Sequence, residues 1–235
     1  MNLLLLSEED FTGANCVQLQ GRRFKHVAEV HRASVGDLLS VGLLNGPLGK
    51  GRVTTLTSGS ITLELHLDQL PPAPLPVTLV LALPRPKVLK RVLIAASSMG
   101  VKKIFLINSF RVEKSFWKSP LLGREQMDEF LTLGLEQAKD TVMPEVHLRP
   151  LFKPFAEDEL PAVIKDTLAL VAHPAAEERC PRGLTQPATL AIGPEGGFIP
   201  YEIEKLAFIG FRPVSLGQRT LRVETVVPAL LSKLF

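Results

Sequence analysis

Hydrophobic and polar residues alternate in the first part of the chain. Between residues 51 and 67, two alternating runs flank Ser58-Gly59-Ser60, which is typical of a β-hairpin. In the second run, Ile61, Leu63 and Leu65 would share one inward face. Further short apolar segments at 2–6, 16–19 and 38–44, with one helix at about 25–30, complete the pattern of a small β-barrel.

After residue 77 the pattern changes to strands that alternate with helices. Residues 77–83 form a continuous apolar run, as expected of a strand covered on both faces. Residues 87–99 place Leu89, Leu93 and Ala96 on one helical stripe. This alternation predicts an α/β fold with a parallel, mostly buried sheet, whereas residues 151–160 give no clear pattern. The further strands expected are 103–108, 167–173, 189–193 and 213–216, and the further helices 124–139, 201–208 and 224–234.

A proline-rich segment separates the two patterns. Leu70-Pro-Pro-Ala-Pro-Leu-Pro76 contains four prolines in seven residues. Proline restricts the backbone and removes a hydrogen-bond donor, so the segment predicts an extended linker. We therefore expect two domains, 1–70 and 77–235.

Composition indicates a globular protein in a reducing compartment. With 235 residues, of which 46% are hydrophobic, the chain can bury a sizeable core. Cys16 and Cys180 are distant in sequence and have no metal-ligand spacing, so we expect reduced thiols and no metal site. The first residues have no cationic region and run into Glu8-Glu9-Asp10, which predicts neither a signal peptide nor a membrane span. The expected location is the cytoplasm.

Positive charge is concentrated although the net charge is only +3. One basic cluster lies near residue 25, and a second lies around residues 87–118. Either cluster alone is explained most simply as a solvated surface. Two clusters in one chain favour RNA as a partner. The candidate RNA-binding residues of the first cluster are Arg22, Arg23, Lys25, His26 and Arg32.

Two loops near the end of the chain carry the strongest functional signal. Ile192-Gly-Pro-Glu-Gly-Gly-Phe198 and Leu216-Gly-Gln-Arg-Thr-Leu-Arg-Val-Glu-Thr225 each follow a predicted strand and precede a predicted helix. Glycine lets backbone approach a ligand closely, and ligands of parallel sheets bind beyond the carboxyl ends of strands. If the two strands are adjacent, these loops face one another across a pocket. Neither loop has the residues that bind nucleoside triphosphates or dinucleotides.

These two loops closely resemble those of the bacterial ribosomal-RNA uridine-N3 methyltransferases of the RsmE family, within the SPOUT superfamily. Weaker likeness occurs at His26, Arg32, Glu136-Gln137 and His173-Pro174. The resemblance implies a SPOUT-type parallel sheet with a C-terminal trefoil knot, preceded by a small PUA-like β-barrel domain that holds RNA. It further implies S-adenosyl-L-methionine as cofactor, small-subunit ribosomal RNA as substrate and a homodimer, with neither a metal nor a membrane partner.

The resemblance also implies roles for individual residues. Arg222 would steady negative charge on the uracil carbonyls, Glu224 would accept the proton or stabilise the last helix, and Arg219 would contact a phosphate. Ile192, Leu216 and Leu221, taken singly, are explained better as ordinary core residues. The cofactor-binding residues implied are Val171, His173, Ile192, Gly193, Gly196, Gly197, Leu216, Gly217 and Leu221.

The chain departs from the family at two places. Ala95 and Ser98 replace a lysine and a glutamate of the family, and Asp140 stands close to where the family has an arginine. These changes leave three functions open: methylation of N3 of a uridine in 16S ribosomal RNA, methylation of another RNA or base, and a non-catalytic role in ribosome assembly.

Overall fold

The computed structural model describes residues 2–235, and it divides into two compact units. One unit comprises the chain up to Ala73 together with Thr132–Met143, and the other comprises Pro74–Leu131 and Pro144–Phe235. The segment 132–143 lies within the second domain expected from the sequence, 77–235, but belongs to the first unit. Each unit is described by itself.

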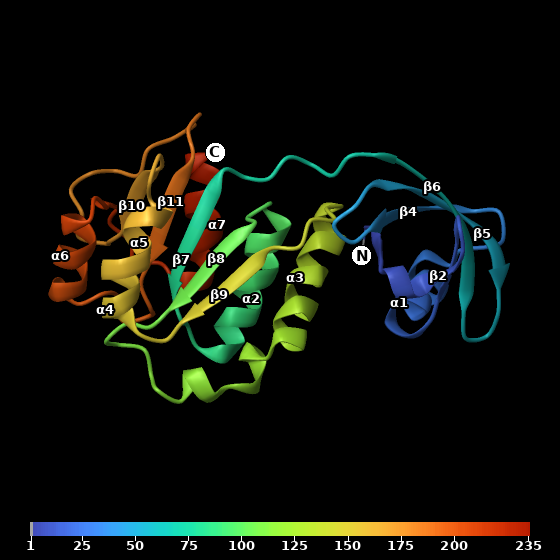
Figure 1. Cartoon of the computed structure of the whole chain (residues 1–235), viewed down its shortest axis with the longest axis horizontal. Helices are drawn as coiled ribbons and strands as arrows, with labels where there is room; N and C mark the ends of the chain where they lie inside the picture. Colours follow the sequence, from blue (N-terminus) through green and yellow to red (C-terminus); the bar gives the residue numbers. More distant parts are fainter. Residues whose placement is uncertain (1) are drawn as a thin grey trace. The chain divides into compact units, whose positions relative to one another are not determined.

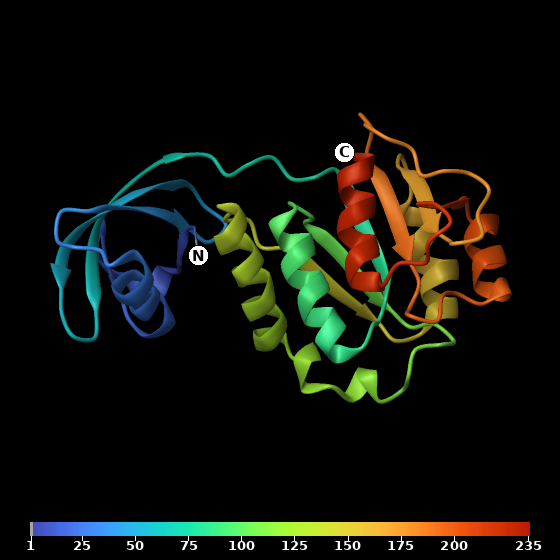
Figure 2. The same cartoon turned by 180° about the vertical axis from the view of Figure 1, so that it is seen from behind.

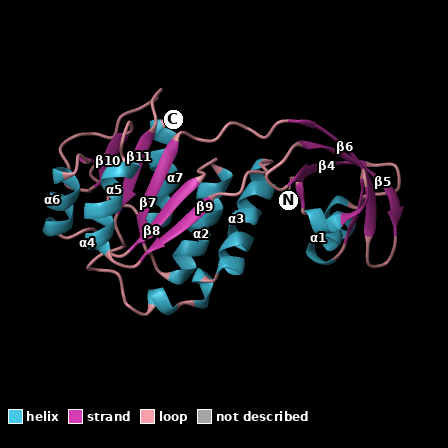
Figure 3. Ribbon diagram, in the orientation of Figure 1, coloured by secondary structure: helices cyan, strands magenta, loops and turns pink. Residues whose placement is uncertain are grey.

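The first unit is built on one six-stranded sheet, which curls around α1 (Figures 1 and 3). The strand order is β1-β4-β5-β6-β3-β2, and only β1 and β4 pair in parallel. The helix α1 (Gly21–His26) continues as a π-helical turn, Val27–His31. The strands are β1 (Leu4–Leu6), β2 (Phe11–Gly13), β3 (Cys16–Leu19), β4 (Leu38–Leu43), β5 (Leu48–Leu56) and β6 (Ile61–Gln69).

The apolar run at the start of the chain is buried on both sides of β1. Leu4 and Leu6 face the core inside the curled sheet, where Leu63 also lies. Leu3 and Leu5 belong to a second cluster with Leu135. Successive side chains of a strand point to opposite faces, so a strand covered on both faces needs the unbroken run of leucines.

The second unit contains a six-stranded sheet in which all strands are parallel. The strand order is β12-β10-β11-β7-β8-β9. This arrangement confirms the predicted α/β fold. The two strands that precede the glycine-rich loops are not adjacent, because β10 lies between β11 and β12. The strands are β7 (Val77–Ala82), β8 (Lys103–Ile107), β9 (Glu145–Arg149), β10 (Leu168–Ala172), β11 (Ala188–Ile192) and β12 (Arg212–Val214).

Helices cover both faces of this sheet. The two helices α2 (Pro86–Ser98) and α7 (Val223–Leu234) pack against each other on one face (Figure 2). The opposite face is covered by a helical segment made of α4 (Phe152–Pro154), a π-helical turn and α5 (Leu160–Val163). The remaining helices are α3 (Arg124–Ala138) and α6 (Pro200–Phe208), and short 3-10 turns lie at Glu8–Asp10, Phe116–Lys118 and Pro120–Leu122.

Candidate functional site

A cavity of about 740 Å³ opens at the carboxyl ends of the parallel strands in the second unit. Loops that follow β10, β11 and β12 form most of its wall, together with the first turns of α7. Arg85 and Arg111, which follow β7 and β8, complete the lining. Five strands therefore contribute to one site, as expected for a parallel sheet.

The structure brings most of the predicted cofactor-binding residues to this cavity. Val171 is the exception, because it is wholly buried within β10 and does not line the cavity. Leu221 is 38% exposed, although it is a large apolar residue. A ligand in the cavity would cover that surface. The predicted residues that line the cavity are His173, Ile192, Gly193, Gly196, Gly197, Leu216, Gly217 and Leu221.

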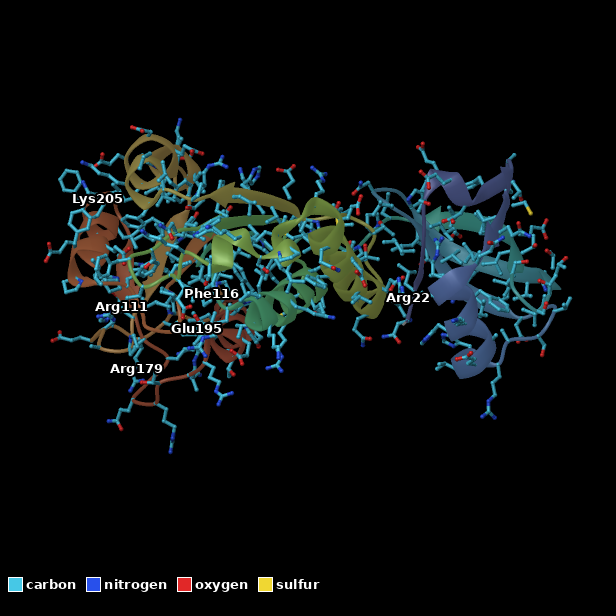
Figure 4. The ribbon with its side chains drawn as sticks, turned by 90° about the horizontal axis from the view of Figure 1, so that it is seen from below. Arg22, Arg111, Phe116, Arg179, Glu195 and Lys205 are labelled. Atoms are coloured by element: carbon cyan, nitrogen blue, oxygen red, sulfur yellow. The ribbon has the colours of Figure 1, made fainter. Side chains whose placement is uncertain are left out.

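Gly196 lies against the side chain of Arg111 as well as at the wall of the cavity. A Cβ atom at this position would lie 3.0 Å from Cδ of Arg111, whose guanidinium Nη1 donates a hydrogen bond to the Gly196 carbonyl oxygen. The side chain of Arg111 therefore lies directly over the glycine-rich loop. Gly217 has a φ of +139°, and a Cβ there would meet Arg179 Nη1 at 2.8 Å. Figure 4 labels Arg111 and Arg179 on this unit.

Two carboxylates hold the loops around the cavity. Glu195 Oε1 accepts a hydrogen bond of 3.0 Å from the Arg85 N–H, which ties the loop after β11 to the start of α2. Glu202 is 2% exposed and accepts bonds from Ser109 Oγ at 3.0 Å, the Phe110 N–H at 2.8 Å and the Ile199 N–H at 3.0 Å. Glu202 thereby joins the loop after β8 to the first turn of α6.

Arg219, Arg222 and Glu224, the charged residues predicted for the reaction, all line the cavity. Arg222 is the N-cap residue of α7 and is exposed. Glu224 lies in the first turn of α7, its side chain is 18% exposed, and its Oε1 lies 3.6 Å from Arg91 Nη1. The geometry thus places a cation and a carboxylate at the same end of one helix.

Arg85, Arg111 and Glu195 also line the cavity. Arg85 was not predicted from the sequence, Arg111 was noted only within the second basic cluster, and Glu195 only as part of the glycine-rich loop. Arg85 comes shortly after the first strand of the sheet, and Arg111 shortly after the second. The rule that ligands bind at the carboxyl ends of parallel strands would have indicated both positions.

The basic cluster of the first unit is partly engaged in internal ion pairs. Arg22 binds Glu136 through two hydrogen bonds of 2.8 and 2.9 Å, and Glu136 is 1% exposed. Arg23 binds both carboxylate oxygens of Asp10 at 2.6 Å. Bidentate pairs of this kind are strong and directional. The structural role of these two arginines is a finding that sequence analysis missed.

The other predicted RNA-binding residues of this unit lie at its surface. Lys25 and Arg32 are exposed, and Arg32 ends the π-helical turn with a φ of +51°. His26 is half-buried and its ring packs edge-on against that of His31, with the centroids 4.9 Å apart. These residues leave part of the cluster accessible to a partner.

Asp10 is held in its charged form. Burial acts to raise its pKa, but hydrogen bonds from Arg23 and from the Ser7 N–H, together with the charge of Arg23, outweigh this effect. The pKa of Asp10 therefore lies below its ordinary value. The Asp10–Arg23 pair stabilises the first unit wherever this carboxylate is ionised.

The residues at which the chain departs from the resembled family make local contacts. Asp140 is buried, and its Oδ1 accepts a hydrogen bond of 2.9 Å from the Val142 N–H. Asp140 therefore turns into its own loop and does not present a charge to solvent. Ser98 Oγ donates to the Ala95 carbonyl oxygen within α2 at 2.8 Å.

Over residues 2–235, no group of three or more His, Cys, Asp and Glu side chains could hold a metal ion. In the same range, no helix is long and apolar enough to cross a membrane. Cys16 and Cys180 are free thiols, and burial raises the pKa of Cys180.

Comparison with known proteins gives one consistent answer. The family model described as an RNA methyltransferase domain matches residues 71–234. The ribosomal RNA small subunit methyltransferase E of Treponema pallidum is 31% identical over 97% of this chain and 88% of its own length. The protein of that name from Synechocystis is 26% identical, over 93% and 72%.

Solved structures share the fold. The crystal structure of a ribosomal RNA small subunit methyltransferase E from Neisseria gonorrhoeae, bound to S-adenosyl methionine, superposes with a TM-score of 0.73. The two sequences are 21% identical, and the match covers 99% of this chain and 96% of the other.

Proposed function

The chain belongs to the ribosomal RNA small subunit methyltransferase E family, and on this premise we propose that it transfers a methyl group from S-adenosylmethionine to N3 of a uridine in 16S ribosomal RNA. The observation that carries the proposal is the single cavity that gathers the two glycine-rich loops with Arg222 and Glu224. Relatives with this name act on small-subunit ribosomal RNA by their description.

The residues around the cavity fit S-adenosylmethionine. A volume of about 740 Å³ lies in the range of small-molecule sites, which are mostly apolar with a few polar groups. Ile192, Leu216 and Leu221 would pack against the adenine ring. Backbone N–H and C=O groups of the loops after β10, β11 and β12 would bind the adenine edge and the ribose. When bound, the cofactor supplies a methyl group on a positively charged sulfur.

Arg222 would stabilise the uracil during the reaction. N3 must lose its proton before it can accept a methyl group, and negative charge then spreads onto the two uracil carbonyls. A guanidinium has several donors in a fixed plane and suits this charge. Arg222 is exposed at the start of α7 and lines the cavity, so it can reach a base that enters from solvent.

Glu224 would accept the N3 proton. Its carboxylate lines the cavity and lies two residues from Arg222. The alternative role is to stabilise the first turn of α7 by its charge, as a carboxylate at a helix N-terminus does. Both roles are compatible with the ion pair to Arg91.

Family membership supports the larger features that the resemblance implies. We propose that the C-terminal domain, 77–235, contains the trefoil knot, with the loops after β11 and β12 as its walls. The curled sheet of residues 1–70 would be a PUA-like domain that holds RNA through Lys25, His26, Arg32 and their neighbours. The protein would act in the cytoplasm as a homodimer.

Substitution of Arg222 tests the proposed chemistry. In Arg222→Ala, the affinity for S-adenosylmethionine should stay within a few-fold of the wild type, because the loops that bind the cofactor are unchanged. Methyl transfer to 16S ribosomal RNA should be lost. Calorimetric titration measures the first quantity and incorporation of labelled methyl groups the second. Retained turnover would remove Arg222 from the reaction.

A further inference from the structure

The loop after β8 presents an uncovered aromatic ring beside the cavity. Phe110 is 78% exposed, whereas its neighbour Arg111 lines the cavity. We call Ser109, Phe110 and Arg111 the 109–111 loop. Folding does not require a phenylalanine in so exposed a position, since the ring contributes little burial.

This exposed loop is held in place. The buried Glu202 binds the Ser109 hydroxyl and the Phe110 N–H, and Arg111 donates to the Gly196 carbonyl oxygen. Both ends of the loop are thereby attached to the second unit, and the Phe110 ring projects from a fixed backbone. A ring presented in this way loses little conformational freedom when a planar group stacks on it.

The charge around the cavity indicates the kind of partner. Arg85, Arg111, Arg219 and Arg222 all line it, and an exposed aromatic ring among cations is the arrangement that binds single-stranded nucleic acid. Bases stack on the aromatic ring, and phosphates bind the guanidinium groups.

We propose that the 109–111 loop is an RNA-binding site at the mouth of the cavity, in which Phe110 stacks on a base next to the target uridine and Arg111 binds a phosphate beside it. This inference rests on the proposed function, and it names the substrate contact that the glycine-rich loops do not supply. Glu202 is then a positioning residue for this contact.

The test compares Phe110→Ala with Phe208→Ala. Phe208, the last residue of α6, is 87% exposed and does not line the cavity. Its substitution therefore removes a similarly exposed ring at a distance from the cavity. Binding of a 16S ribosomal RNA transcript is measured in the presence of S-adenosylhomocysteine, together with the KM for RNA in methyl transfer. Phe110→Ala should weaken RNA binding and raise this KM about tenfold or more, with cofactor affinity unchanged. Phe110→Trp should restore both, and Phe208→Ala should change neither.

A second variant tests the charge. Arg111→Gln should weaken RNA binding and reduce the slope of log affinity against log salt concentration by about one, as expected for one lost phosphate contact. Its control is Arg124→Gln, because Arg124 pairs with Asp128 on the exposed surface of α3.

Two outcomes would overturn the inference, and a third would contradict only the proposed function. RNA affinity of Phe110→Ala within twofold of the wild type would overturn it. A molar mass of Phe110→Ala in light scattering that differs from that of the wild type would also overturn it. The ring would then be covered by another protein chain in the wild type. Wild-type protein that binds the transcript without methylating it would contradict the proposed function alone, since the binding comparison still decides the role of Phe110.

Discussion

A side chain at Gly196 would crowd Arg111, which lies 3.0 Å from the position of its Cβ. The Arg111 stem packs over the glycine, and its guanidinium binds the same residue's carbonyl oxygen. The glycine at position 196 was predicted to make room for a ligand, whereas in the structure it makes room for Arg111. This distinction changes what a substitution does, because a larger residue displaces Arg111 before it meets a cofactor.

Substitution of Gly196 by valine should lower cofactor affinity at least tenfold. The added side chain forces Arg111 away and shifts the loop that forms one wall of the cavity. Gly59→Val is the control, since a Cβ at Gly59 has no atom within 4 Å. Calorimetry with S-adenosylmethionine measures the effect, and an unchanged dissociation constant for Gly196→Val would exclude this loop from the cofactor site.

The Asp10–Arg23 pair makes the stability of the first unit depend on pH. Asp10→Asn should lower the free energy of unfolding by about 1–3 kcal/mol near neutral pH, because a charged hydrogen-bonded partner of Arg23 is lost. The pKa of Asp10 is depressed in the folded state. Its contribution is therefore complete above the unfolded carboxyl pKa of about 3.9 and is lost as the pH falls through the lower folded value.

Chemical denaturation at several pH values measures this contribution. The difference between wild type and Asp10→Asn should shrink as the solution is acidified below about pH 4. Asp68→Asn removes a half-exposed carboxylate from the same unit and should change stability by less than about 1 kcal/mol. A difference for Asp10→Asn that stays constant with pH would show that the ionised pair is not its source.

The substitution Glu224→Gln distinguishes the two roles considered for Glu224. If Glu224 accepts the N3 proton, turnover should fall by about 10²–10⁴ and recover partly at higher pH, where solvent removes the proton more readily. If the carboxylate only stabilises α7, stability should fall by about 0.3–1 kcal/mol with turnover retained. We expect the first result. Measurement of kcat against pH, with thermal unfolding as the control, distinguishes them.

Among the elements, the loop after β8 and helix α6 depend on one buried carboxylate. Glu202→Gln keeps the shape of the side chain but replaces one acceptor oxygen with a donor. At least one of the three groups that donate to Glu202, the Ser109 hydroxyl and the Phe110 and Ile199 N–H groups, then loses its acceptor. The unfolding free energy should fall by about 1–3 kcal/mol, and the KM for RNA should rise more than kcat falls. Equal KM values for the variant and the wild type would indicate that the loop is held by other contacts.

Element types were predicted best where burial was complete. The continuous apolar runs of β7 and β11 identified buried parallel strands, and the leucine stripe identified α2. β9 was missed because it is a half-exposed edge strand with charged residues at both ends. The helical segment from Phe152 to Val163 was missed because Pro154, Pro161 and a π-helical turn interrupt the helical period.

At the scale of the whole molecule, the sequence predicted the parallel α/β fold and the family, and both are confirmed. It did not predict that Thr132–Met143 belongs to the first unit. Glu136 in this segment carries a charge, which is typical of a surface residue, but it is buried and binds Arg22. The two residues are 114 positions apart, so a local sequence pattern does not reveal the pair. Arg85 and Arg111 follow predicted strands, but neither lies in a glycine-rich loop, so no local motif marked them as cavity residues.

The site is therefore a product of topology. Five strand ends meet only after the sheet has formed, and the order β12-β10-β11-β7-β8 places the glycine-rich loops, the 109–111 loop and α7 around one cavity. The cavity gathers the parts that the proposed methyl transfer would use: the glycine-rich loops, the Arg222 guanidinium and the Glu224 carboxylate.

The most direct measurement is mass spectrometry of nucleosides from 16S ribosomal RNA that has been incubated with the protein and S-adenosylmethionine. The RNA should come from cells that lack this protein, so that the target is unmodified. We predict 3-methyluridine at one position, and no such product from Arg222→Ala. A methyl group on another base or another atom, or no transfer in the presence of bound cofactor, would contradict it.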